Sequence, residues 1–168
     1  MTRDIVRDLG FLTLGSRLKR LGERLQAQTQ ELLREAGIEV PASHAPLLAA
    51  LDRLGPMSVG RIADALGTSQ PGVTRQLATL QALGLVATAA APDDGRQRTV
   101  SLTPAGRRLL AQAKQKTWPR VEAAVVHACG PRGPELLHRL AELEDALDSR
   151  SLLQRAPSRK EARRDGSA

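Results

Sequence analysis

Aromatic residues are nearly absent from this sequence of 168 residues. They make up 1% of the chain, as Phe11 and Trp118, and there is no tyrosine. Hydrophobic residues nevertheless make up 41%, as in an ordinary globular protein. The core must therefore be built from leucine, valine, isoleucine and alanine, and this composition favours packed helices over a large sheet.

Cysteine and long apolar runs are scarce as well. The one cysteine, Cys129, excludes an intramolecular disulfide framework, which fits a reducing cytoplasm. No run approaches the roughly 18 apolar residues that span a bilayer. The charged residues 1–10 do not resemble a signal peptide. We therefore expect a cytoplasmic protein with no membrane partner.

The sequence offers little for metal or acid–base chemistry. His127, Cys129 and His138 form the only conceivable metal cluster, and they lack a fourth ligand and the usual zinc spacing. There is no glycine-rich phosphate loop and no recognisable Ser/His/Asp arrangement. We expect no metal, no cofactor and no enzymatic activity.

Positive charge, in contrast, is abundant. Lysine and arginine number 25 against 18 aspartates and glutamates, which gives a formal net charge of +7. Such an excess favours a polyanionic partner, either a nucleic acid or an acidic membrane surface.

Helical spacing dominates the pattern of apolar residues. One long helix is predicted over about residues 4–35, ended by Gly37, and Ser43 is the expected N-cap of a short helix that ends at Gly55. A last helix follows a break at residues 130–134. Both terminal helices carry leucines at coiled-coil spacing: Leu14, Leu18, Leu21, Leu25 and Leu32 in the first, and Leu136, Leu140, Leu143 and Leu147 in the last.

Residues 58–106 carry the element order of a winged helix-turn-helix. Ser58 and Ser69 are the expected N-caps of two successive helices, which glycines end. Candidate strands at 85–90 and 98–102 flank a turn-rich loop, and Thr103 begins a further helix that Pro119 should kink. The sequence therefore predicts a mostly α fold, with a winged helix-turn-helix domain and a small β-hairpin wing.

The second of these two helices would enter the major groove of DNA with its N-terminal residues. Glutamine can pair with adenine, arginine with guanine, and a threonine methyl can contact thymine. The candidate DNA-contacting residues of this helix are Ser69, Gln70, Pro71, Gly72, Thr74, Arg75 and Gln76. The alternative is an ordinary capped amphipathic helix with a solvated polar face.

The loop between the two strands strengthens the DNA interpretation. Arg96 and Arg98 lie at its tip and exit, where a guanidinium on a narrow finger fits the electronegative minor groove. Asp94 precedes Arg96 by two residues and can hold it by a hydrogen bond. The alternative is a set of locally paired surface charges, which would add only about 0–1 kcal/mol to stability.

The leucine seams at the two ends of the chain predict a homodimer, because apolar stripes left over from one subunit would pack on another. The alternative is that they pack on their own chain. A two-fold dimer presents two recognition helices, so its DNA site should be an inverted repeat. The expected organisation is an N-terminal dimerisation helix (1–40), the winged helix-turn-helix (41–106), C-terminal dimerisation helices (107–154) and a basic disordered tail (155–168).

Two motifs resemble the MarR (multiple antibiotic resistance regulator) family. The run from Asp94 to Gly106 matches that family's wing signature: Asp, any residue, Arg, five residues, Leu-Thr, two residues, Gly. The stretch from Leu66 to Arg75 is similar to the family's turn and recognition helix. The terminal helices are similar to its dimerisation elements, so the resemblance covers about residues 5–150.

The resemblance implies roles for individual residues. It assigns Ser69, Gln70, Pro71, Thr74 and Arg75 to the major groove, Arg96 to the minor groove and Asp94 to the orientation of Arg96. It also implies a homodimeric repressor, less often an activator, that a small amphipathic or phenolic ligand releases from DNA. The family layout gives the candidate ligand-lining residues Leu12, Ser16, His44, Leu48 and Trp118, each of which has simple packing as its alternative.

The resemblance also bears on Cys129. Oxidant sensors of the family hold their thiol near the first helix with tyrosines around it, and this chain has neither feature, which indicates an unreactive thiol. The sequence thus predicts a DNA-binding transcriptional regulator. The remaining alternative is a winged helix used only as a protein-interaction module, which would need an apolar patch at the hairpin in place of Arg96 and Arg98.

Overall fold

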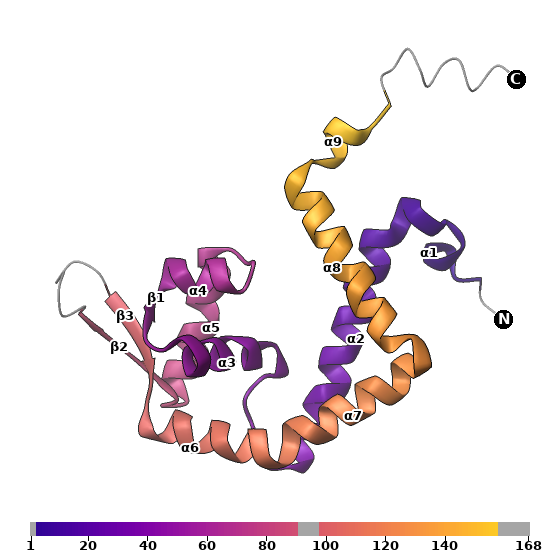
Figure 1. Cartoon of the computed structure of the whole chain (residues 1–168). Helices are drawn as coiled ribbons and strands as arrows, with labels where there is room; N and C mark the ends of the chain where they lie inside the picture. The colour runs from indigo at the N-terminus through magenta and orange to yellow at the C-terminus, as the bar shows by residue number, and fades with distance from the viewer. Residues whose placement is uncertain (1–2, 91–97, 158–168) are drawn as a thin grey trace, which may run out of the picture. The chain divides into compact units, whose positions relative to one another are not determined.

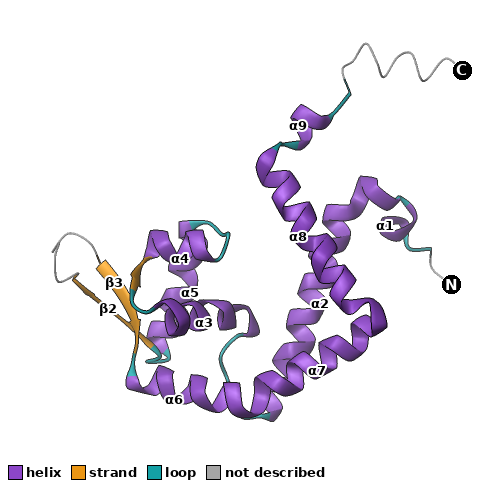
Figure 2. Cartoon of the chain, in the orientation of Figure 1, coloured by secondary structure: helices purple, strands orange, loops and turns teal. Residues whose placement is uncertain are grey.

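The computed structural model describes residues 3–90 and 98–157, and the chain divides into two units, residues 1–121 and 122–168. Figures 1 and 2 show the helices and strands of both. The predicted fold class is confirmed, because the chain is mostly helical with a small antiparallel sheet of three strands. The predicted domain boundaries at residues 40, 106 and 154 are divisions by function and stay predictions.

The first unit begins with α1 (Ile5–Asp8), a 3₁₀ turn (Gly10–Thr13) and α2 (Leu14–Glu35). The prediction of one continuous helix over residues 4–35 is therefore wrong at its start. Gly10 has a φ of +57°, a left-handed value that an α-helix does not contain. The Oγ1 of Thr13 donates to the carbonyl of Val6 at 2.6 Å and so stabilises the break.

Asp4 ties α1 to α2. Its carboxylate accepts hydrogen bonds from the guanidinium of Arg20 at 3.1 and 2.8 Å and from the backbone N–H of Arg7 at 3.2 Å. The hydrogen bond from Arg20, above all, lowers the pKa of Asp4 below its ordinary value.

The predicted cap at Ser43 is wrong. Residues Ala42–His44 already form a 3₁₀ turn, and α3 (Ala45–Leu54) begins directly after it with His44 in the N-cap position. The hydroxyl of Ser43 instead lies 3.1 Å from Nδ1 of His44. Gly55 ends α3 as predicted, with a φ of +78°.

The winged helix consists of β1 (Met57–Ser58), α4 (Val59–Ala65), α5 (Gln70–Ala82), β2 (Val86–Ala90) and β3 (Arg98–Leu102), and the elements after β1 follow the predicted order. Ser58 and Ser69 cap α4 and α5 as predicted, since their hydroxyls accept from the backbone N–H of Arg61 at 3.4 Å and of Gly72 at 3.3 Å.

The three strands form an antiparallel sheet in the order β1-β3-β2. Val86 pairs with Leu102 and Ala90 with Arg98, while Met57 of β1 pairs with Val100. The strand β1 was not predicted, because two residues are too few to show a period. It ties the start of the helix-turn-helix to the wing.

An aliphatic core holds the winged helix together, as the shortage of aromatic residues requires. The largest fully buried side chains are Leu47, Ile62, Val73, Leu80, Val100 and Leu110. They come from α3, α4, α5, β3 and α6 (Pro104–Gln112), so the sheet and these four helices share one interior. Trp118 is only partly buried against this core.

The kink expected at Pro119 takes the form of a π-helical turn at Ala113–Thr117, between α6 and α7 (Trp118–Cys129). The N–H of Trp118 donates to the carbonyl of Ala113, five residues back. Pro119 has no N–H, and its ring would crowd the carbonyl one turn earlier, which explains a widened turn at this point. Lys114 pairs with Asp52 of α3 there.

The second unit contains the end of α7, a 3₁₀ turn (Gly130–Arg132), α8 (Gly133–Ser149) and α9 (Leu152–Arg155). The break predicted at residues 130–134 is thus present, and a second one, capped by Ser151 and Gln154, separates α9. Much of the predicted tail, residues 158–168, lies outside the described residues. Among the described residues, no helix combines the length and the apolar character needed to cross a membrane.

Candidate nucleic-acid interface

The helix α5 buries one face and exposes the residues predicted to contact DNA. Val73, Leu77 and Leu80 lie in the core. The predicted residues Ser69, Gln70, Pro71, Thr74 and Arg75 are exposed, and Gly72 and Gln76 are half-buried. The structure therefore brings all seven predicted residues onto the accessible side of one helix start.

Hydrogen bonds within α5 decide what its side chains can offer a ligand. The Oγ1 of Thr74 donates to the carbonyl of Gln70 at 2.9 Å, so its methyl group and its acceptor lone pairs remain. No carboxylate among residues 3–90 and 98–157 lies within ion-pair distance of Arg75. The exposed guanidinium of Arg75 is therefore the strongest hydrogen-bond donor on this helix.

Gly72 keeps the first turn of α5 open. A Cβ on this residue would lie 3.3 Å from Oγ of Ser69 and 3.4 Å from Oγ1 of Thr68, which is a tight contact. The absence of a side chain leaves both hydroxyls accessible beside the backbone N–H groups of the helix start. A phosphate or a backbone segment of a partner can therefore approach α5 closely at Gly72.

The wing is only partly described. Arg98 is exposed at the start of β3, opposite Ala90 of β2, whereas Asp94 and Arg96 lie outside the described residues. The base of the wing is attached to α5, because Nε2 of Gln81 donates to Oγ1 of Thr88 at 2.7 Å. This hydrogen bond connects α5 to the β2–β3 pair, whose loop end carries Arg98.

Thr103 begins α6 as predicted and caps it by accepting from the N–H of Gly106 at 3.0 Å. Two other contacts at the wing base were not predicted. The Oγ1 of Thr103 donates to the carbonyl of Gly84 at 2.6 Å. A Cβ on Gly106 would lie 2.1 Å from the carbonyl oxygen of Leu85, so α6 and the start of the wing touch at their backbones. The glycine at the end of the wing signature was visible in the sequence, but its contact was not.

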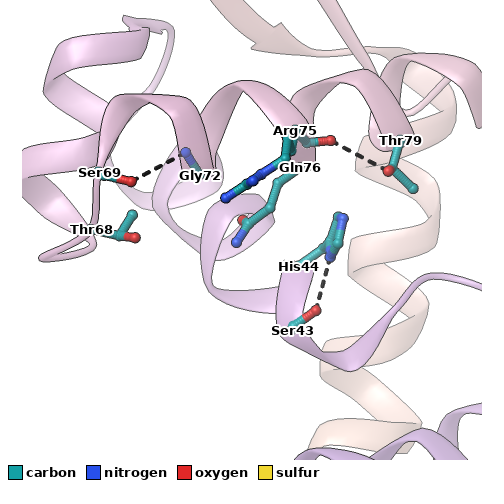
Figure 3. A pocket seen from close by; sticks show the side chains of 8 residues that line it. All are labelled: Ser43, His44, Thr68, Ser69, Gly72, Arg75, Gln76 and Thr79. Carbon is teal, nitrogen blue, oxygen red and sulfur yellow. Dashed lines mark hydrogen bonds between the residues drawn. The ribbon is translucent and has the colours of Figure 1, made fainter.

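A groove of about 400 Å³ runs along α5 and is lined by polar residues (Figure 3). One wall is α5 with the turn before it, and the other is the 3₁₀ turn that precedes α3. Its lining residues are Ser43, His44, Thr68, Ser69, Gly72, Arg75, Gln76 and Thr79. Sequence reasoning placed four of these eight on the DNA-contacting helix and His44 at a ligand pocket, and it missed Ser43, Thr68 and Thr79 because nothing local marks them.

Two residues that line this groove each have a buried side-chain atom, Nε2 of His44 and Oε1 of Gln76, without a hydrogen-bond partner in the described part of the chain. Burial lowers the pKa of His44 below its ordinary value of 6.5, since the neutral ring is cheaper to bury than the charged one. The ring is thus neutral at pH 7 in the free protein.

The candidate ligand residues do not form one pocket. Leu48 and Trp118 line a cavity of about 20 Å³ between α3, α6 and α7, which has room for about one water molecule. His44 lines the separate polar groove, and neither Leu12 nor Ser16, both exposed, lines either space. The predicted grouping of these five residues stays a prediction.

The three candidate metal ligands are His127, Cys129 and His138. Cys129 is exposed near the end of α7. Within the described ranges 3–90 and 98–157, His, Cys, Asp and Glu side chains nowhere gather in a group of three or more that could hold a metal ion.

Comparisons with known proteins indicate the MarR family. Residues 36–97 match the family model described as MarR family. The structure is similar to that of CouR, a transcriptional repressor solved bound to a 23-mer DNA duplex, with 28% identity and a TM-score of 0.68 over 81% of this chain and 96% of that one. No curated protein matches the chain at a significant level.

Two further solved structures share the fold. A mutant MarR from E. coli, complexed with operator DNA, is 18% identical with a TM-score of 0.69 over 83% of this chain and 97% of that one. BpsR from Bordetella bronchiseptica, whose DNA binding is described as regulated by 6-hydroxynicotinic acid, is 24% identical with a TM-score of 0.67, over 78% of this chain and 92% of that one.

Proposed function

We propose that this chain, whose winged helix is of the MarR family, is a homodimeric transcriptional repressor that binds an inverted-repeat operator. The observation that carries the proposal is the start of α5. There Thr74 and Arg75 are exposed on a capped helix whose other face is locked into the core. Such a helix can present base-reading side chains without reordering on binding.

The proposed roles of α5 and of the wing depend on the chemistry of their side chains. Arg75 reads a base edge in the major groove, where a well-placed arginine discriminates by about 1–3 kcal/mol. Arg98 and Arg96 of the wing engage the minor groove and the phosphates, and Asp94 orients Arg96 by a hydrogen bond. Affinity then comes mainly from the positive charge, and specificity from α5.

A second copy of the chain is proposed to bury the exposed apolar residues in a dimer interface. In the first unit Phe11 is 95% exposed and Leu12 83% exposed, and Leu25 of α2 is exposed as well. In the second unit Leu137 and Leu153 are exposed. Leucine-rich helices left open at both ends of a chain fit a symmetric helical interface, and a regulator of this kind would act in the cytoplasm beside its DNA.

A small amphipathic or phenolic molecule is the proposed releasing signal. The proposed ligand site is the apolar cavity lined by Leu48 and Trp118, because it lies between α3 of the winged helix and the start of α7. It holds only about one water molecule, so a ligand would have to open it. We infer that the apoprotein represses transcription and that a ligand releases it from DNA by widening this cavity.

The recognition assignment is tested by a charge-matched pair of variants. Arg75→Ala and Arg108→Ala each remove one exposed arginine, the first from α5 and the second from α6. On a duplex selected from a random pool, Arg75→Ala should weaken binding by about tenfold or more and relax the preference at one base position. Arg108→Ala should change affinity little. Equal losses in the two variants would contradict base reading by α5.

The dimer is tested separately by sedimentation. Leu25→Glu places a charge on the apolar seam of α2 and should shift the protein towards monomer, whereas Gln26→Glu, on the neighbouring exposed position, should not. A wild-type protein that sediments as a monomer at every concentration would contradict the proposed assembly.

A further inference from the structure

Arginine dominates the lining of another groove, which has a volume of about 200 Å³ and lies between α1 and the first half of α2. Its lining residues are Asp4, Arg7, Arg17, Arg20, Leu21 and Arg24. The lining therefore carries four positive charges and one negative charge, and both oxygens of that one carboxylate already accept from Arg20. This arginine groove keeps an excess of positive charge that an acidic partner would neutralise.

Three of these arginines have no acidic partner in the described part of the chain. Arg7, Arg17 and Arg24 form no ion pair within residues 3–90 and 98–157. A guanidinium presents its N–H donors as a fork that matches a carboxylate, with which it can form two parallel hydrogen bonds. The arginine groove therefore favours a partner surface that carries several carboxylates.

The arginine groove lies along one side of the leucine seam of α2. Three of its arginines each precede a seam leucine by one residue, in the pairs Arg17–Leu18, Arg20–Leu21 and Arg24–Leu25. Positions with this spacing form a stripe beside the seam, and Leu21 lines the groove itself. The three leucines are exposed, and a second copy of the chain is their proposed partner. A helix that covers the seam would therefore also lie over the arginines.

The helix α8 carries the complementary negative charge. Residues 140–149 contain no lysine or arginine, and their acidic residues are Glu142, Glu144, Asp145 and Asp148. Glu142 lies 2.8 Å from Arg139 of its own helix. The other three carboxylates are exposed, and none of them forms an ion pair with another described residue. They share two turns with Leu143 and Leu147, so these charges too lie beside an apolar seam.

We propose that, in the homodimer, α8 of one copy packs on α2 of the other, with Glu144 and Asp148 in the arginine groove. These two acidic residues are four positions apart and so share one face of α8. The proposal rests on the proposed function and deepens it, because it identifies the charges that select a second copy of this chain as the partner. Each contact occurs twice in a two-fold dimer.

The ion pairs act mainly on partner choice. Isolated ion pairs at a surface add little affinity, because water screens them and two long side chains lose freedom. Charges beside an apolar seam nevertheless decide which helices pair, since a wrong partner brings like charges together. Reversal of the charges on one side should therefore weaken the dimer more than simple removal would.

Two reciprocal variants test the pairing. The α2 variant combines Arg17→Glu with Arg24→Glu, and the α8 variant combines Glu144→Lys with Asp148→Lys. Dimerisation of the full chain is measured by sedimentation, without DNA, for each variant alone and for an equimolar mixture. Circular dichroism confirms that each variant is folded, and native mass spectrometry identifies the mixed dimer.

The control variant combines Lys19→Glu with Arg53→Glu. It changes the net charge as much as the α2 variant does, but both of its positions are exposed and lie outside the arginine groove. The control should dimerise like the wild type. A loss equal to that of the α2 variant would overturn the proposal, because net charge alone would then explain the result.

The proposal predicts weak dimers for each variant and recovery in the mixture. At about 0.1 M salt, each variant alone should dimerise about tenfold or more weakly than the wild type, and the difference should shrink at about 1 M salt. In the mixed dimer, one contact joins two reversed partners and the other joins two native partners, so both contacts join opposite charges. The mixture should therefore regain the affinity of the wild type.

The same charges could instead meet within one chain, and the mixture separates the two cases. A contact within one chain leaves each variant with its own like charges, so mixing would restore nothing. Recovery only when all four substitutions are placed in one chain would therefore overturn the proposal.

A conservative variant covers the case in which the charge reversals disturb the fold. Arg24→Lys keeps the positive charge, and a zero-length carbodiimide cross-linker joins a lysine to a carboxylate in contact with it. In dimers assembled from isotope-labelled and unlabelled chains, the introduced lysine should be linked to Glu144 or Asp148 of the other isotope. Cross-links that join only chains of the same isotope, or none at these residues, would overturn the proposal.

The proposed function and the ion pairing fail on different results. A wild-type chain that sediments as a monomer at every concentration contradicts the homodimer and with it the proposed function. A wild-type dimer whose two variants do not recover on mixing contradicts only the pairing of α8 with the arginine groove.

Discussion

Replacement of Gly106 by alanine tests the closest backbone approach in the winged helix. A Cβ on Gly106 would lie 2.1 Å from the carbonyl oxygen of Leu85 and 3.0 Å from its carbon, and both are main-chain atoms that cannot rotate away. The same carbonyl accepts from the N–H of Thr103 at 3.0 Å. The start of α6 must therefore move away from the wing base by about 1 Å to admit one methyl group.

The cost can be worked from these contacts. Overpacking of a buried site costs about 1–3 kcal/mol, and a weakened Thr103–Leu85 hydrogen bond adds about 0.5–1.5 kcal/mol. Alanine regains about 0.5–1 kcal/mol from its better helix propensity. We expect Gly106→Ala to lower the free energy of unfolding by about 2–3 kcal/mol, which lowers the Tm of a chain of this size by about 4–12 °C.

The assay is urea and thermal unfolding followed by circular dichroism, with Gly15→Ala as the control. Gly15 is exposed in α2, and a Cβ there meets nothing within 4 Å, so alanine should stabilise the protein by about 0.5–1 kcal/mol. The two substitutions add the same atom and should act in opposite directions. A Gly106→Ala protein as stable as the wild type would refute the close approach of α6 to the wing.

Further predictions concern the cap, the wing, the tail and the N-terminus. Ser69→Ala removes the hydroxyl that accepts from the N–H of Gly72 and should lower the free energy of unfolding by about 1 kcal/mol. Its affinity for DNA should also be lower. Arg96→Ala should weaken DNA binding by about tenfold or more and lower the salt slope by about 1; unchanged binding by a folded variant would contradict the wing assignment. Truncation after Leu153 should reduce binding only at low salt, and an unaltered low-salt affinity would dismiss a role for the tail. Because the folded pKa of Asp4 lies below 3.8, its pairing with Arg20 should persist at pH 5 and be lost as the pH falls through that folded pKa, which an NMR titration of the carboxyl group can follow.

The sequence predicts the local features of the winged helix well. The caps at Ser58, Ser69 and Thr103 depend on residues within one turn of the chain, and all three are present. Gly67 and Gly84 end their helices with positive φ, as a glycine after an apolar repeat indicates. These elements could be predicted because the residue that begins or ends each helix lies next to that helix in the sequence.

What sequence reasoning missed depends on contacts between distant segments. The strand β1 exists because Met57 finds Val100 as a partner. The polar groove exists because the turn that carries His44 packs across from α5. The break at Gly10 was missed because it lies before Leu14, the first leucine of the seam, where no apolar repeat defines the helix, and only the positive φ of this glycine marks it.

The candidate site divides in the same way. The seven predicted residues of α5 could be placed on one helix start because a capped helix fixes their order. Leu12, Ser16 and His44 could not be placed with Leu48 and Trp118, because a cavity depends on how several elements pack. The remaining candidates, Asp94 and Arg96, lie outside the described residues and rest on the motif alone.

The central claim is that this chain reads a DNA sequence as a symmetric dimer. The most direct test is the selection of bound duplexes from a random-sequence pool at near-physiological salt. The account predicts recovery of a single inverted repeat whose half-sites lie about one helical turn apart. Recovery of no common sequence, with weak and strongly salt-dependent binding to every duplex, would contradict it and would favour a winged helix that contacts proteins instead.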